Sequence, residues 1–368
     1  MINRDELRCN AGQMLLVGFQ GHSVPDELRQ RLQRGEAGGV IYFARNLAEP
    51  EQVCALSSEV IAACRPDDPP PFISVDQEGG RVQRLRQPPF TRIPPMAVLG
   101  ATGDAELAAR IGQAMGEELA AVGINLDFAP CADLRTNPAN QVIGDRSLGD
   151  DPATVARLCG AFAAGLTIAG VIPCFKHFPG HGDTFADSHF ELPLLEHDIE
   201  LLRRREIAVF ARLLRGPVPM IMTAHLRIPA IDTRHPMTLS AQCIDQLLRR
   251  TLHHGGVVIS DDLEMAAIAD HHDVGDIVRL GLRAGLDLFL FCHSAERQIQ
   301  AWEALVRLGE QSTGDRERIA QSAGRIRFLK SSYLRHWEPP VDVRSHLGTT
   351  AHEELVHELE RRGRGAAP

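Results

Sequence analysis

The stretch DPATVARLCGAFAAGLTIAGVIPCFKH (residues 151–177) is predicted to form one helix followed by one strand. Asp151 followed by Pro152 favours a helix start, because the carboxylate caps free amide groups and proline fits the first turn. Gly170 ends the helical pattern, and the apolar run 171–177 is too short for a typical helix. Because this run is almost continuously apolar, it is typical of a parallel strand that is buried on both faces.

Similar segments recur along the chain, and several are rich in β-branched residues and bounded by glycine or proline. The eight predicted strands are MLLVGF (14–19), GGVIYF (38–43), PFISVD (71–76), INLDFAP (124–130), VIPCFKH (171–177), VPMIMTAH (218–225), GGVVISDD (255–262) and LDLFLFC (286–292). Helical patterns lie between them; in residues 104–122 the apolar side chains follow a helical period, from Asp104 as the N-cap to Gly123.

This alternation of strands and helices predicts an α/β fold, a single (β/α)₈ TIM-type barrel. The alternative is an open, doubly wound sheet, but no GxGxxG motif follows the first strand. We expect the barrel to occupy residues 1–330 as one domain, since no linker interrupts that range. Residues 331–368 are expected to form a helical or irregular C-terminal arm of unknown role.

The composition is that of a globular enzyme, with 44% apolar and 24% charged residues. The formal net charge is −9, and no Lys/Arg-rich block is interleaved with aromatic residues, which argues against a nucleic-acid partner. No apolar stretch approaches the roughly 20 residues of a membrane-spanning helix, and the first 19 residues lack the pattern of a signal peptide. We therefore expect a cytoplasmic enzyme with a small-molecule substrate, no membrane partner, and an oligomeric state that the sequence leaves open.

Charged side chains follow five of the predicted strands, where barrels of this kind carry their active sites. They are Asp76, Glu78, Arg81, Arg84, Asp133, Arg146, Lys176, His177, His181, Asp183, Asp187, His189, His225, Asp261 and Asp262. A lone carboxylate at a strand end more often caps the next helix than takes part in chemistry. The convergence of charges from separate strands on one end of a barrel favours a catalytic site.

The loop after the fifth strand, KHFPGHGDTFADSH (176–189), is the most informative of these segments. Asp187 and His189 are two residues apart, so in an extended backbone they lie on the same side and can hydrogen-bond. A carboxylate that binds one imidazole nitrogen leaves the other nitrogen free to transfer protons near neutral pH. The pair is therefore a candidate general acid/base.

Zinc binding by His177, His181 and His189 is the chemical alternative for the same loop. We expect no metal, because these histidines lie on a glycine-rich loop without fixed helical spacing and no HExxH motif is present. The eight cysteines contain no CxxC pair, which indicates neither a zinc site nor a disulfide framework. The histidine pairs at 253–254 and 271–272 are predicted to be solvated residues at helix ends.

The 176–189 segment closely resembles the signature of NagZ-type β-N-acetylglucosaminidases of glycoside hydrolase family 3. Matching blocks follow the family order: SVDQEGGRVQRL (74–85), INLDFAPCADL (124–134), IGDRSL (143–148) and ISDDLEM (259–265). The resemblance implies a retaining exo-β-N-acetylglucosaminidase without metal or organic cofactor. It further implies a muropeptide substrate, from which N-acetylglucosamine is released from 1,6-anhydro-N-acetylmuramic acid during peptidoglycan recycling.

The resemblance also implies roles for individual residues. Asp261 corresponds to the nucleophile, His189 to the general acid/base and Asp187 to its partner. The residues implied to bind the sugar hydroxyls are Asp76, Arg84, Arg146, Lys176 and His177. The sequence departs from the family at Leu148, where an aromatic residue is common. A β-glucosidase or broader β-hexosaminidase of the same fold, and a sugar-binding protein without turnover, are the alternatives.

Overall fold

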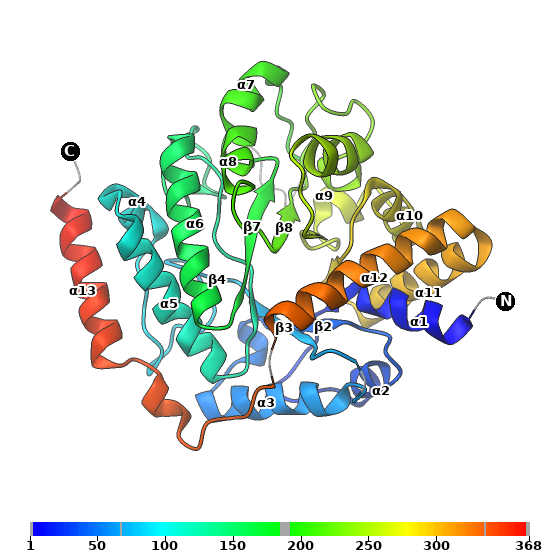
Figure 1. Cartoon of the computed structure of the whole chain (residues 1–368), viewed down its shortest axis with the longest axis horizontal. Coiled ribbons are helices and arrows are strands. Elements are labelled where there is room, and N and C mark those ends of the chain that lie inside the picture. Colours follow the sequence, from blue (N-terminus) through cyan, green and yellow to red (C-terminus); the bar gives the residue numbers. More distant parts are fainter. Residues whose placement is uncertain (1–2, 67, 185–191, 335, 366–368) are drawn as a thin grey trace.

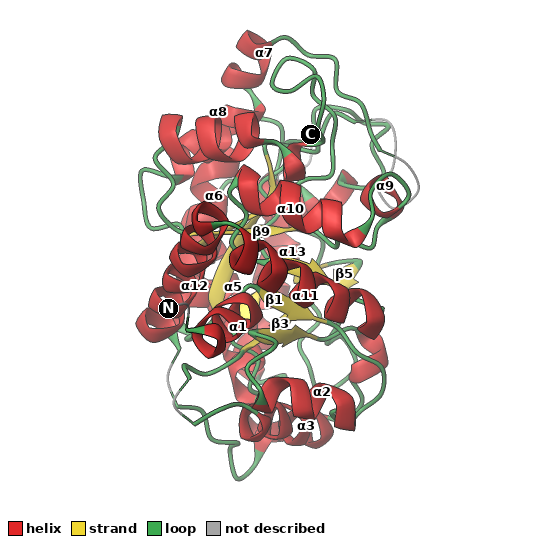
Figure 2. Ribbon diagram, turned by 90° about the vertical axis from the view of Figure 1, so that its right-hand side faces the viewer, coloured by secondary structure: helices red, strands yellow, loops and turns green. Residues whose placement is uncertain are grey.

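The computed structural model describes residues 3–66, 68–184, 192–334 and 336–365. A sheet of eight parallel strands lies at the centre, and helices surround it (Figures 1 and 2). The strands are β1 (Leu15–Val17), β2 (Gly39–Ile41), β3 (Phe72–Val75), β6 (Leu126–Asp127), β7 (Ile172–Phe178), β8 (Met220–Thr223), β9 (Val257–Ser260) and β10 (Phe289–Phe291). Seven lie within a predicted strand segment and β7 extends one residue beyond its segment, to Phe178, so the predicted strand pattern is confirmed.

The strands pair in the order β10-β1-β2-β3-β6-β7-β8-β9. The two ends of this order also meet, because the Ser260 amide donates to the Leu288 carbonyl at 3.1 Å and the Leu288 amide donates to Val258 at 3.0 Å. The sheet therefore closes into the predicted TIM-type barrel. Closure buries both faces of the strands, which is why their sequences are predominantly apolar.

Helices and short helical turns form the outer layer of the barrel. They are α1 (Arg4–Gln13), α2 (Asp26–Gln33), α3 (Pro50–Ala63), α4 (Met96–Thr102), α5 (Ala105–Ala121), α6 (Pro152–Ile168), α7 (Ile199–Arg204), α8 (Glu206–Leu213), a π-helix (Gln242–Thr251), α9 (Ala266–Ala269), α10 (Val274–Ala284), α11 (Ala295–Gln311), α12 (Thr313–Tyr333) and α13 (Thr350–Gly365). The predicted caps are confirmed, since Asp104 accepts from the Leu107 amide at 3.1 Å and Asp151 from Thr154 at 2.8 Å. No helix in the described parts of the chain is both long and apolar enough to cross a membrane.

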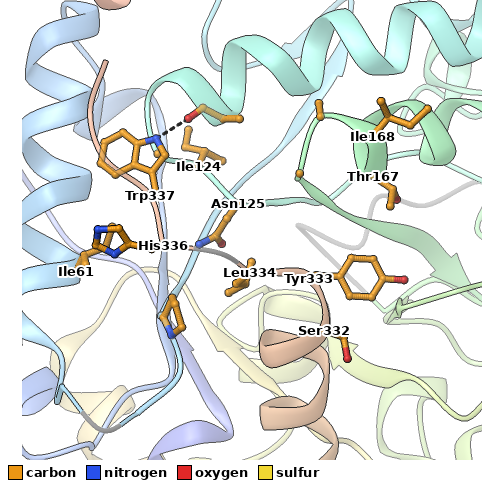
Figure 3. Close-up of a pocket in the computed structure, with 15 residues that line it drawn as sticks. Ile61, Ile124, Asn125, Thr167, Ile168, Ser332, Tyr333, Leu334, His336 and Trp337 are labelled. Carbon is orange, nitrogen blue, oxygen red and sulfur yellow. Dashed lines mark hydrogen bonds between the residues drawn. The ribbon is translucent and has the colours of Figure 1, made fainter. Parts of the chain in front are cut away.

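The end of the barrel where the strands begin is covered by the last part of the chain. The Trp337 indole donates to the Ala120 carbonyl at 2.8 Å, beside a cavity of about 590 Å³ that Tyr333 and Ile168 also line (Figure 3). Beyond this cavity, α13 packs against α4 and α5 (Figure 1). Ile124 and Asn125, which precede β6, line the same cavity, so it lies at the end of the barrel opposite to the carboxyl ends of the strands.

One sequence-based expectation is wrong in this region. His254 was expected to be solvated, but its side chain is buried beside β9, and burial lowers its pKa to about 4. The ring lies 3.3 Å from the Val257 carbonyl through Nε2. The turn between the π-helix and β9 folds His254 under the barrel, a placement that the local sequence pattern does not show.

Candidate active site

A cavity of about 430 Å³ opens at the carboxyl ends of the strands. Its described lining consists of Ile41, Phe43, Asp76, Arg84, Phe128, Met222, Asp261, Asp262, Glu264, Met265, Ala266, Asp270, Leu290, Cys292 and His293. The lining combines apolar side chains with carboxylates, one guanidinium and one imidazole. A concave site with a few convergent polar groups is typical of small-molecule binding.

A chain of ion pairs runs from the cavity wall into the barrel. Arg84 NH2 lies 3.5 Å from Asp76 Oδ2, and Lys176 Nζ lies 2.8 Å from Asp76 Oδ1. The same ammonium is 2.6 Å from Glu78, which also accepts two hydrogen bonds from Arg146, at 2.8 and 2.7 Å. The structure therefore brings four of the five predicted sugar-binding residues into one network, with Asp76 and Arg84 at the cavity and Lys176 and Arg146 behind them.

The pKa shifts of Glu78 and Lys176 show that the network stabilises the ionised forms of its members. Burial disfavours ionisation of Glu78, yet Arg146 and Lys176 outweigh it and hold the pKa of Glu78 well below its ordinary value. Burial likewise disfavours the ammonium of Lys176, but Asp76 and Glu78 raise its pKa above its ordinary value. Burial also disfavours ionisation of Asp76, but Lys176 and Arg84 outweigh it and lower its pKa. The network therefore presents the Asp76 carboxylate to the cavity as a hydrogen-bond acceptor.

A second buried carboxylate, Asp133, holds two histidines, His177 within β7 and His181 in the loop after it. Its Oδ2 lies 2.6 Å from His177 Nδ1, and its Oδ1 accepts from the His181 amide at 2.6 Å. β7 contributes to this geometry, because its pairing register with β8 shifts between Phe175 and Phe178 and so redirects Lys176 and His177. Asp133 thus fixes the orientation of the His177 ring.

Asp261 and Asp262 follow β9 and have different surroundings. Asp261 lines the cavity and accepts a hydrogen bond from the Asp262 amide at 2.8 Å. Burial raises its pKa, but His177 and His225 outweigh burial, so the pKa of Asp261 lies below its ordinary value. Asp262 instead stabilises a turn, since its Oδ1 accepts from the Glu264 amide at 3.1 Å and the Cys292 amide at 3.3 Å.

His225, at the end of β8, supports this arrangement. Its Nδ1 lies 2.8 Å from the Thr238 hydroxyl, and its Nε2 lies 2.9 Å from the Asp262 carbonyl. Because both ring nitrogens make hydrogen bonds to neighbouring groups, this ring positions the Asp261–Asp262 turn. Asp187 and His189, the predicted acid/base pair, lie outside the described residues.

The described residues include one set that could be considered for a metal ion. The ligand atoms of Cys131, Asp133 and His177 lie within 4.8 Å of one another. Both Asp133 oxygens already accept hydrogen bonds, and burial raises the pKa of the Cys131 thiol well above its ordinary value, whereas metals bind the thiolate. This cluster therefore fits a hydrogen-bonded positioning role and does not fit a metal centre.

Phe43 and His293 are among the cavity residues that were not predicted from the sequence. The Phe43 and His293 rings stack with centroids 5.8 Å apart, and the Arg45 guanidinium lies 4.4 Å from the Phe43 ring on the cavity wall. Both residues stand at a strand end, Phe43 as the last residue of the predicted 38–43 strand and His293 just after the 286–292 strand. Position after a strand is the signal that could have found them.

Leu148, the departure from the family pattern, is buried against α4. Its carbonyl approaches Gly100 so closely that a Cβ added there would lie 2.0 Å from the oxygen. The Glu78 ion pair, rather than the residue at 148, orients the guanidinium of Arg146. An aliphatic residue at 148 is thus compatible with a fixed Arg146.

Replacing Glu78 with alanine is expected to lower the free energy of unfolding by about 3–5 kcal/mol. The change leaves the buried Arg146 cation without its carboxylate partner, and Lys176 keeps only Asp76. An uncompensated buried charge is strongly destabilising. Urea denaturation followed by circular dichroism measures the effect. Glu360→Ala, which breaks an exposed pair with Arg364, is the control and should change little. A loss below about 1 kcal/mol for Glu78→Ala would show that the network contributes little to the fold.

A pH dependence follows from Asp133. Burial opposes its ionisation, but His177 and His181 lower its pKa from 3.8 to about 2. A carboxyl group with a lowered folded-state pKa stabilises the fold above pH 3.8 and loses that contribution as the pH falls toward 2. The unfolding free energy of the wild type should therefore fall more steeply than that of Asp133→Asn between pH 4 and 2.5. Parallel curves would contradict this assignment.

Comparison with known proteins identifies the family of this chain. Residues 6–329 match the N-terminal domain of glycosyl hydrolase family 3. The chain belongs to glycosyl hydrolase family 3. The predicted family is thereby confirmed, and with it the class of glycoside hydrolases.

Individual relatives within family 3 are similar over most of the chain. A beta-hexosaminidase of Pseudomonas aeruginosa is 40% identical over 295 residues, which cover 80% of this chain and 86% of that protein. A family 3 beta-N-acetylglucosaminidase from a Paenibacillus species has 41% identity and a TM-score of 0.92, covering 97% of this chain and 68% of its own. NagZ of Neisseria gonorrhoeae in complex with N-trifluoroacetyl-D-glucosamine has 30% identity and a TM-score of 0.78, covering 95% and 98%.

Other relatives in the family are longer or carry a metal. Beta-hexosaminidase A of Pseudoalteromonas piscicida is 34% identical over 361 residues, and this chain spans 60% of its length. Another structure of the Neisseria NagZ is a complex with a zinc ion, at 30% identity, a TM-score of 0.75 and coverage of 95% of this chain and 97% of that one.

Proposed function

We propose that this chain is a retaining exo-β-N-acetylglucosaminidase. The observation that carries the proposal is Asp261, an ionised carboxylate at the end of β9 inside a 430 Å³ cavity, across which Asp76 and Arg84 offer polar contacts to a sugar. Its similarity to the beta-N-acetylglucosaminidase from Paenibacillus and to Neisseria NagZ in complex with an N-acylglucosamine supports the choice of sugar.

Asp261 acts as the nucleophile in this proposal. Its carboxylate attacks the anomeric carbon and forms a covalent glycosyl-enzyme, while the bond to the leaving-group oxygen breaks. His189, held by Asp187, gives a proton to that oxygen and then takes one from the water that hydrolyses the intermediate. Asp76, Arg84, Arg146, Lys176 and His177 bind or orient the sugar hydroxyls directly or through the ion-pair network.

The proposal also covers the natural substrate and the cellular compartment of the reaction. We propose that the natural substrate is a muropeptide in which N-acetylglucosamine is β-linked to 1,6-anhydro-N-acetylmuramic acid, and that hydrolysis takes place in the cytoplasm during peptidoglycan recycling. The absence of any need for a metal or organic cofactor is part of the same proposal, since Asp261 and the Asp187–His189 pair supply both catalytic groups.

Three measurements test the proposal. Rates on aryl β-N-acetylglucosaminide and aryl β-glucoside should differ in favour of the first, and a defined muropeptide disaccharide should yield free N-acetylglucosamine. A preference for the glucoside would instead assign a β-glucosidase, and binding of the sugar without any turnover would assign a binding protein. Loss of turnover in EDTA, restored by zinc, would assign a metal-dependent hydrolase.

The reaction is expected to proceed with net retention at the anomeric carbon. Attack by Asp261 inverts the centre once, and attack by water inverts it again, so the first-formed product has the β configuration. Proton NMR in the first minutes of a reaction on an aryl β-N-acetylglucosaminide distinguishes the anomers before mutarotation. A first-formed α anomer would show a single displacement and would make Asp261 a general base.

A further inference from the structure

The chain between β7 and α7 has two described ends, 179–184 and 192–198, which meet at a hydrogen bond between Asp183 and His197. The carboxylate of Asp183 accepts a hydrogen bond from Nε2 of His197. Arg205 NH2 donates to the same carboxylate oxygen at 2.9 Å. Asp183, His197 and Arg205 therefore form a cluster, called here the stem cluster, that joins the two flanks of residues 185–191.

The stem cluster is shielded from solvent. The side chains of Asp183, His197 and Arg205 are 16%, 26% and 25% exposed. Arg205 also lies 2.9 Å from the carboxylate of Glu206, whose side chain is 1% exposed. Partly buried ion pairs are screened less by salt than surface pairs, so these contacts restrain their partners more firmly than exposed pairs do.

The surrounding fold fixes where each member of the cluster stands. Arg205 lies between α7 and α8, at a break in the helical backbone with φ −111° and ψ −93°, and this break turns its side chain toward Asp183. Glu206 packs directly on Gly180, where an added Cβ would lie 2.5 Å from the Glu206 Cβ. His197 precedes Asp198, which caps α7 by accepting from the Leu201 amide at 2.7 Å.

Each flank is also attached separately to a neighbouring loop. Asn140, from the loop after β6, donates to the His181 carbonyl at 2.8 Å. On the other flank, the Leu195 amide donates to the Arg227 carbonyl at 2.9 Å, and the Arg227 amide donates to Pro193 at 2.8 Å. Loss of the stem cluster should therefore leave both flanks folded while it removes the direct link between them.

We propose that Asp183, His197 and Arg205 are positioning residues for the general acid/base. They tie the two described flanks, 179–184 and 192–198, to each other, and the chain between these flanks carries Asp187 and His189. This inference rests on the proposed function, in which His189 transfers the proton. Catalytic groups must be held within a fraction of an ångström, and a misplacement of about 1 Å can cost about 100-fold in rate.

The test is the leaving-group dependence of His197→Ala. On a disaccharide of N-acetylglucosamine, whose leaving group needs protonation, kcat/KM should fall by about 10- to 100-fold. On 2,4-dinitrophenyl β-N-acetylglucosaminide, whose leaving group needs no proton, the fall should stay below about 3-fold. A variant that merely disturbs the fold slows both substrates alike, so the ratio of the two rates separates positioning from structure.

Conservative variants and a matched control complete the design. His197→Gln keeps an N–H donor for Asp183 and should restore much of the disaccharide rate. Asp183→Asn weakens the same contact in a nearly isosteric side chain and carries the test if His197→Ala does not fold. Glu200→Ala, in an exposed pair with Arg203 on α7, should leave both rates unchanged.

The outcomes also separate this inference from the proposed function. If His189→Ala shows the leaving-group dependence and His197→Ala and Asp183→Asn do not, the inference is wrong and the acid/base assignment stands. If His189→Ala slows both substrates equally, the acid/base assignment is wrong and the inference is overturned with it. Selective loss on the disaccharide in both His189→Ala and His197→Ala supports the inference.

Discussion

Replacing Asp261 with asparagine is expected to reduce kcat/KM on N-acetylglucosaminides by at least about 1,000-fold, or about 4 kcal/mol of transition-state stabilisation. The amide cannot form the glycosyl-enzyme, so the oxocarbenium-like transition state loses its covalent partner. The side chain keeps an oxygen that can accept from the Asp262 amide, as the carboxylate does at 2.8 Å, and the fold should be retained. Steady-state kinetics and thermal unfolding measure the two properties.

Asp262→Asn is the matched control for this prediction. The Asp262 carboxylate accepts from the backbone amides of Glu264 and Cys292, contacts that an asparagine oxygen can also make. We therefore expect a modest loss of stability and a rate within about 10-fold of the wild type. If Asp262→Asn reduced turnover far more than Asp261→Asn, the nucleophile would be Asp262 and the assignment of Asp261 would be wrong.

The second large effect concerns the acid/base pair. His189→Ala should slow hydrolysis of natural disaccharides by about 10²–10⁴-fold, which is the usual contribution of general acid catalysis. Aryl glycosides with good leaving groups should be slowed much less in the glycosylation step, because their leaving oxygen needs little protonation. The quantity to measure is the ratio of kcat/KM values for the two substrate types, in the variant and in the wild type.

Asp187→Ala should act in the same direction as His189→Ala, through a ring that is less well oriented and less basic. Since the two residues act as one unit, the double variant should be little worse than the worse single variant. Fully additive losses would point to two independent structural roles, in which His189 binds backbone groups and Asp187 forms a turn.

The sequence by itself determined the architecture. Each strand could be located because a parallel strand that is buried on both faces is a nearly continuous run of apolar residues, and such a run is visible in the sequence. The caps at Asp104 and Asp151 were predictable for the same reason, since a cap is a contact with a residue two or three positions away. The family was evident from ordered blocks such as 176–189 and 259–265.

The geometry of the site was only partly predictable. That Asp76, Lys176 and Asp261 would lie at one end of the barrel follows from their positions at the carboxyl ends of the predicted strands. The central place of Glu78 in the ion-pair network could not be predicted in this way. Its partner Arg146 lies 68 residues further along the chain, and its other partner, Lys176, lies in β7. The different surroundings of Asp261 and Asp262 likewise depend on another segment, because Asp262 accepts a hydrogen bond from the Cys292 amide.

Only the tertiary structure decided which charges pair and which side chains face the cavity. Asp133 could have capped a helix, but in the folded chain it binds His177 and the His181 backbone. His254 could have been solvated, but it is buried beneath the barrel. Local patterns reflect burial and hydrogen bonding within a few residues of the chain, whereas ion pairs across a barrel depend on strand register and loop path, which arise only when distant segments pack together.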